Sequence, residues 1–189
     1  MIEEAFCALI RNRSIENQTA MGRVGHAPVA LSPTFSIIRQ ELDSMIRVIY
    51  LLNVEDLEVR RDLMRMTVEG ETWSVRTTRG RARRVTDRDM VALADRLQGW
   101  SEIVYRFGCA FVHLSNLHGL DPDDPLDQLP PTERGDVLRY LRNYHGGPQR
   151  DTPDLEELGR YLPLVLSKIS SNLMHYVRDL EASSVWIDE

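Results

Sequence analysis

One stretch of the chain, residues 100–119, carries an arginine and two histidines within its most apolar and aromatic sequence. On a helix that turns about 100° per residue, Arg106 and His113 lie within roughly 20° of each other and share a face. Histidine titrates near neutral pH and can act as a general base or acid, whereas arginine stays charged and binds phosphate bidentately. The pair therefore suits metal-independent RNA cleavage, which needs a base for the 2′-hydroxyl proton and a fixed cation beside the phosphorane. One such pair is half a site, and a two-fold dimer would place two pairs across one cleft.

The second histidine of this stretch, His118, lies about 140° further round the helix than His113, so the two histidines do not share a face. Metal sites on helices usually use ligands three or four residues apart, and neither a metal nor another cofactor is predicted. His118 falls in the last turn of the expected helix, where it acts either in catalysis or by binding unpaired carbonyl groups. His113 has an alternative role as a hydrogen-bonded core residue, and Arg106 has one as an ion-pair partner of Glu102.

A second candidate region, residues 70–88, is rich in arginine and has no helical periodicity. Trp73, Val75 and Thr77 alternate as in a β-strand, so the segment is either a β-hairpin or a basic loop. Like charges at this density repel one another unless an anionic partner neutralises them. The residues that we predict to contact RNA phosphates are Arg79, Arg81, Arg83 and Arg84. The alternative interpretation is a solvated surface segment without a ligand.

The spacing Arg106-x6-His113 resembles the R-x4–6-H signature of HEPN domains, which are all-α bundles that often dimerise and cleave RNA without a metal. The segments YRFGCAFVHLSNLHG and IIRQELDSMIRVIYLL are also similar to HEPN-like proteins of bacterial abortive-infection and toxin systems. In such proteins a helix ends in S-x-x-H, and Ser115 and His118 match that pattern. The resemblance covers residues 33–120. It implies a dimeric endoribonuclease of a toxin or phage-defence type, in which Arg106 stabilises the phosphorane and His113 or His118 is the acid or base.

A non-catalytic interaction or regulatory protein, derived from a degenerate HEPN-like module, is the alternative function. HEPN domains often have a polar residue directly after the arginine, whereas Phe107 stands at that position here. The net charge of −6 also argues against nonspecific coating of duplex DNA. The expected partners are a second copy of the chain, RNA, and an antitoxin or other protein.

Helical periodicity outside residues 70–88 predicts an all-α fold. We expect an up-and-down bundle of five to six helices in a single domain over residues 1–189, with a small β-hairpin or loop insertion around 70–85. The expected helices cover residues 2–20, 33–52, 54–67, 86–118, 132–144 and a last segment capped by Asp151 or Thr152. Pro163 should kink or split that last helix. Gly99, inside the 86–118 helix, indicates a kink or the close approach of another helix.

The 33–52 segment has a clear amphipathic pattern with two distinct faces. Its predicted core stripe consists of Ile38, Leu42, Met45, Ile49 and Leu52. Arg39, Asp43 and Arg47 follow one another at intervals of four, which predicts a solvated face with weak ion pairs.

The composition is ordinary for a soluble globular protein, with 42% hydrophobic and 28% charged residues. No apolar run has the length of a membrane span, and the first residues lack the basic lead of a signal peptide. Cys7 and Cys109 lie in apolar helical patterns, which favours buried free thiols over a disulfide. We therefore expect a cytoplasmic protein without a membrane partner.

Overall fold

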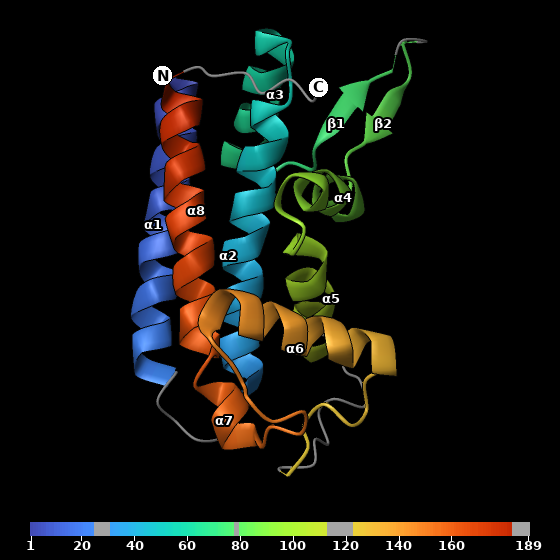
Figure 1. The fold of residues 1–189 in the computed structure, drawn as a ribbon. Coiled ribbons are helices and arrows are strands. Elements are labelled where there is room, and N and C mark those ends of the chain that lie inside the picture. The colour runs from blue at the N-terminus through green and yellow to red at the C-terminus, as the bar shows by residue number, and fades with distance from the viewer. Residues whose placement is uncertain (25–30, 78–79, 113–122, 183–189) are drawn as a thin grey trace.

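The computed structural model describes residues 1–24, 31–77, 80–112 and 123–182, with positions 31 and 107–112 described by their backbone alone. The helices are α1 (Ile2–Val24), α2 (Leu31–Leu52), α3 (Leu57–Val68), α4 (Asp87–Gln98), α5 (Ser101–Val112), α6 (Pro131–His145), α7 (Leu155–Gly159) and α8 (Leu162–Glu181). The strands are β1 (Ser74–Arg76) and β2 (Ala82–Arg84). Figure 1 shows α1, α2 and α8 side by side, α6 crossing α5, and the hairpin projecting beyond α4. The predicted all-α class with a small β insertion is confirmed.

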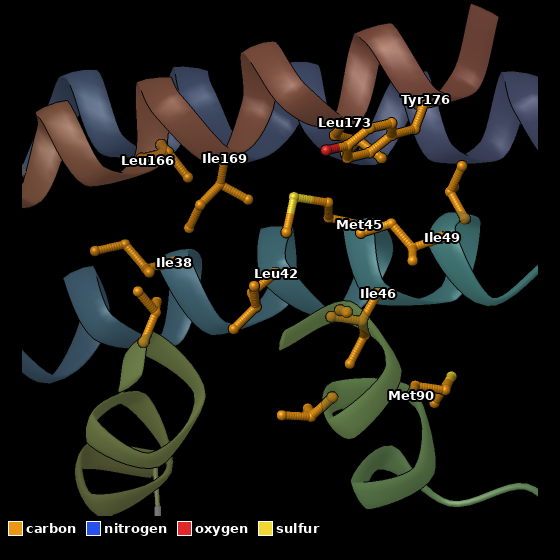
Figure 2. Packing of buried hydrophobic residues seen from close by; sticks show 14 of the residues in the cluster. Ile38, Leu42, Met45, Ile46, Ile49, Met90, Leu166, Ile169, Leu173 and Tyr176 are labelled. Carbon is orange, nitrogen blue, oxygen red and sulfur yellow. The ribbon is translucent and has the colours of Figure 1, made fainter. Parts of the chain in front are cut away.

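The central helix is α2, which contacts α1, α4, α5 and α8. Its predicted core stripe is buried throughout, and Ile46, Val48 and Leu51 are buried as well. In Figure 2, Met45 and Ile49 face α8, whereas Ile46 lies on the side of α4. Full burial of a large aliphatic side chain contributes about 1.5–3 kcal/mol relative to leaving it exposed. A helix covered on several sides therefore supplies much of the hydrophobic stabilisation.

The charged ladder of α2 is half-buried, and the prediction of a solvated face is wrong. The side chains of Arg39, Asp43 and Arg47 are 13%, 18% and 25% exposed. Arg39 Nη2 lies 3.1 Å from Asp87 Oδ2 at the start of α4, and its guanidinium lies 4.0 Å from the centroid of the Tyr105 ring on α5. Arg13 of α1 also pairs with Asp43, at 3.1 Å. Because α4 and α5 pack over this face, the ladder joins α2 to α1, α4 and α5.

The helix expected over residues 86–118 is interrupted at Gly99, which separates α4 from α5. Gly99 adopts φ +67° and its N–H donates to the Asp95 carbonyl, as in a left-handed helix C-cap. A Cβ at this position would meet nothing within 4 Å, so a close helix contact does not explain the glycine. The chain turns here and places Trp100, 2% exposed, in the core beside Tyr140. At the other end of α4, Thr86 and Asp89 form the capping box that begins the helix.

The arginine-rich segment forms a β-hairpin. β1 and β2 are antiparallel, with Ser74 opposite Arg84 and Arg76 opposite Ala82. The base of the hairpin is fixed by Trp73, which is buried and donates from Nε1 to Thr67 Oγ1 at 2.7 Å. The basic-loop alternative is therefore excluded for the described part of the segment.

The last helical segment is divided into α7 and α8, as the position of Pro163 predicts. Pro163 lies in the first turn of α8, where a missing backbone N–H is tolerated. The cap of α7 is Asp154, which accepts a hydrogen bond from the Glu157 N–H, so the prediction of Asp151 or Thr152 is wrong.

Two further sequence expectations concern the cysteines and the membrane. Cys7 is a buried free thiol, and burial raises its pKa to about 11; the side chain of Cys109 lies outside the described residues. Within the described ranges, no helix combines the length and the apolar character needed to cross a membrane.

Candidate functional site

Arg106 lies on α5 with 59% of its side chain exposed. Two carboxylates hold it in place: Nη2 is 3.5 Å from Glu133 Oε1 on α6, and Nε is 3.9 Å from Glu102 Oε1 one turn earlier on α5. The predicted alternative for Arg106, an ion pair with Glu102, is therefore present, and Glu133 adds a second pair.

The cleft beside Arg106 has a volume of about 220 Å³ and lies between α4, α5 and α6. Its apolar lining residues are Ile103, Leu129 and Val137, and its acidic ones are Asp95, Glu102, Glu133 and Asp136. Asp136 is paired with Arg139, and the other three carboxylates outnumber the guanidinium of Arg106. The cleft therefore has a negative field, which repels a phosphate and attracts a cation. This part of the proposed catalytic site is therefore poorly suited to an RNA backbone unless further cations complete it.

The two candidate histidines, His113 and His118, lie outside the described residues, as does Ser115. The helical phase that places Arg106 and His113 on one face is supported as far as Val112, the last residue of the described part of α5. The Arg106–His113 pair thus stays a prediction. Within the part of the chain that the structure describes, no three histidine, cysteine or acidic side chains gather as a metal site would require.

The arginines of the hairpin differ from one another in their partners. Arg83 is held by Asp89, with Nη1 3.2 Å from Oδ1, whereas Arg81 and Arg84 are exposed and have no carboxylate partner among the described residues. Arg79 lies outside the described residues. The pairing of strands explains the difference between Arg83 and Arg84, because Arg83 stands opposite Val75 on one face and Arg84 stands opposite Ser74 on the other; Arg81 precedes β2. Of the predicted phosphate contacts, Arg81 and Arg84 are therefore free to bind a ligand.

Two more arginines belong to this surface and were not among the predicted RNA contacts. Arg76 in β1 and Arg88 at the start of α4 are exposed, and neither has a carboxylate partner within the described ranges. Both lie within the run of six arginines over residues 76–88, which was the available signal. That run contains one acidic residue, Asp87, and so carries a net charge of +5 in a chain whose total is −6. Arg76, Arg81, Arg84 and Arg88 are together called the hairpin arginines.

Arginines elsewhere in the molecule are mostly paired with carboxylates. Such pairs involve Arg11, Arg13, Arg39, Arg47, Arg61, Arg65, Arg106, Arg134, Arg139, Arg142, Arg150 and Arg160. Some exposed arginines have no carboxylate partner in the described structure. Among these, only Arg23 and Arg178 lie outside the hairpin and α4. The unpaired positive charge is thus concentrated on one region of the surface.

A buried polar cluster around Glu41 was not predicted. Glu41 on α2 is 0% exposed and accepts hydrogen bonds from Asn17 Nδ2 at 2.8 Å, from Ser170 Oγ at 2.7 Å and from Ser14 Oγ. Its position three residues after Ile38 and four before Met45 puts it beside the core stripe, and this was the signal in the sequence. The cluster joins α1, α2 and α8 and does not line the cleft beside Arg106, so its role is structural.

Comparison with protein-family models, with curated proteins and with solved structures finds no match. The function is consequently inferred from the geometry of the molecule itself.

Proposed function

We propose that this protein binds RNA, with the hairpin arginines as its phosphate-contacting surface. The observation that carries the proposal is the concentration of exposed, unpaired guanidinium groups on the hairpin and the adjoining first turn of α4 in an otherwise acidic protein. Mutual repulsion of these charges costs free energy, and an anionic polymer would offset it by neutralising them and releasing counterions. The acidic remainder of the molecule restricts the contact to this element, since a polyanion is repelled elsewhere.

The salt dependence of binding to a short single-stranded RNA tests this proposal. Replacing Arg81 and Arg84 by glutamine should weaken binding and lower the slope of log affinity against log salt by about 1.4, because each phosphate contact on a single strand contributes about 0.7. The measurement is fluorescence anisotropy over a range of NaCl concentrations.

The matched control is Arg23→Gln with Arg178→Gln, which removes two exposed and unpaired charges from α1 and α8. Both double variants have the same net charge. Equal weakening by the two variants would show that the total charge governs binding and would refute a hairpin surface.

A second candidate function is metal-independent cleavage of RNA by a HEPN-like dimer of a toxin or phage-defence type. It is supported by the exposure of Arg106, which lines a cleft. A buried arginine could not reach a substrate. The surrounding carboxylates count against it, and His113 or His118 would have to supply the acid and base.

An RNA cleavage assay in EDTA distinguishes binding with cleavage from binding alone. If the wild type cleaves and the Arg106→Ala/His113→Ala variant does not, the protein is a ribonuclease. If the wild type and the variant both cleave RNA only at the background rate, the protein binds RNA without cleaving it. Sedimentation analysis of the wild type tests the proposed dimer independently.

A further inference from the structure

The cleft between α3 and the hairpin has a volume of about 420 Å³, within the range of small-ligand pockets. It is lined by Val59, Asp62 and Met66 of α3 and by Ser74, Val75, Arg76 and Ala82 of the hairpin. Val59 and Met66 pack against the hydrophobic core, so the cleft has an apolar wall on the side of α3 that the fold supports. An apolar cleft beside unpaired arginines suits a ligand with both apolar and anionic parts.

The register of the hairpin places two of its arginines on one face, and one of them lines this cleft. Residues directly opposite each other in an antiparallel pair share a face, so Ser74, Arg84, Arg76 and Ala82 lie on one face of the hairpin. Arg76 itself lines the cleft, and Arg84 stands opposite the cleft residue Ser74. One guanidinium group without a carboxylate partner in the described structure thus lines the slot, and a second lies on the same face of the hairpin.

Asp62 supplies a hydrogen-bond acceptor at the edge of the slot. Its Oδ1 accepts from Arg65 Nη2 at 3.2 Å, whereas no donor to Oδ2 is present among the described residues. A carboxylate accepts hydrogen bonds and cannot donate them, so it favours a base that presents an amino group.

We propose that this cleft binds one unpaired, amino-bearing base of a single-stranded RNA, with the adjoining phosphates on Arg76 and Arg84. A base has two apolar faces for the walls of the slot, and a guanidinium plane can stack on it. Single strands expose bases in this way and duplexes do not. The inference extends the proposed RNA-binding function and depends on it.

The test compares three oligonucleotides of equal length, namely oligocytidine, oligouridine and an abasic backbone. Wild-type protein should bind oligocytidine about tenfold more tightly than the abasic strand, and about fivefold more tightly than oligouridine, whose base lacks an amino group. Ala82→Leu should remove the preference for a base, because the added side chain fills a cleft that the exposed Ala82 leaves open. The control is Ala92→Leu at an exposed position of α4.

Asp62→Asn tests the acceptor separately. An amide can donate to the uracil carbonyl as well as accept, so the ratio of oligocytidine to oligouridine affinity should fall to about one. This ratio is insensitive to the lost negative charge, which alters the binding of both strands equally.

The failures of the two proposals are distinguishable. Absence of wild-type binding to all three strands at low salt would overturn the RNA-binding function itself. Equal binding of the abasic and base-bearing strands would overturn the base site alone. A polyglutamate peptide could also displace RNA from the wild-type protein. If Ala82→Leu weakened binding of this peptide as much as it weakens binding of RNA, the cleft would be assigned to an acidic protein partner and the base site would be refuted.

Discussion

At the residue scale, Glu41 shows how a charged side chain can be accommodated in the core. Three donors from two other helices surround its carboxylate, and no basic side chain forms an ion pair with it in the described structure. A buried carboxylate is tolerated only when hydrogen bonds replace its hydration. The cluster therefore depends on the simultaneous presence of α1, α2 and α8.

Glu41→Ala should lower the free energy of unfolding by about 3 kcal/mol or more, because it leaves buried donors without an acceptor. Ser170→Ala removes one donor and keeps the carboxylate partly satisfied, so it should cost about 1 kcal/mol. Urea denaturation monitored by circular dichroism measures both. A smaller loss for Glu41→Ala than for Ser170→Ala would contradict this account of the cluster.

His145 gives the molecule a specific response to acid. Burial lowers its pKa, and the nearby charge of Lys168 lowers it further. The unfolded chain therefore takes up the proton at a higher pH than the folded chain does. The contribution of His145 to stability is present at neutral pH and is lost as the pH falls below about 6.5.

His145→Gln should reduce the loss of stability between neutral pH and about pH 5, as followed by urea denaturation at each pH. An unchanged acid-induced loss would exclude His145 as its source.

At the element scale, the glycines at helix ends have a different role from those inside helices. Gly99 has φ +67° and ends α4, whereas Gly135 lies within α6 with ordinary helical geometry. At both positions an added Cβ would have no atom within 4 Å, so backbone conformation alone separates them.

Gly99→Ala should destabilise the protein by about 1–2 kcal/mol, because a residue with a Cβ is strained in the left-handed region. Gly135→Ala should stabilise it by about 0.5–1 kcal/mol through better helix propensity. Thermal denaturation of the two variants provides the comparison. The same sign of effect for both would show that local conformation is not the determinant.

At the scale of the whole molecule, one hydrophobic cluster connects the helices on both sides of α2. Trp73 at the base of the hairpin and Trp100 at the start of α5 both belong to it. A single core of this kind favours cooperative unfolding.

We therefore expect the tryptophan fluorescence and circular dichroism transitions in urea to coincide. Leu42→Ala, at the buried centre of α2, should lower the free energy of unfolding by about 2–5 kcal/mol. Both transitions should then move together to a lower urea concentration. Separate transitions would instead indicate that α4, α5 and the hairpin unfold independently of the α1–α2–α8 group.

The amino-acid pattern left the arginine-rich segment open between a hairpin and a loop. It alone determined the helical class, the core stripe of α2 and the division at Pro163. These features depend on local periodicity and on the conformational limits of single residues, which the order of residues records directly. The pattern also located the arginines of the hairpin, although it did not separate Arg83 from Arg81 and Arg84.

Only the tertiary structure decided which charges are neutralised. Arg83 is paired with Asp89 on α4, Arg106 with Glu133 on α6, and the ladder at Arg39 with Asp87. Each of these three ion pairs joins side chains on separate elements, and the spacing within one helix cannot predict such a pair. At Gly99 the sequence left a kink and a close helix contact open, and the structure decided for the break, with no atom near an added Cβ. The sequence therefore located the segments that are rich in arginine. The packing of the helices decided which of these arginines have no carboxylate partner and can bind a ligand.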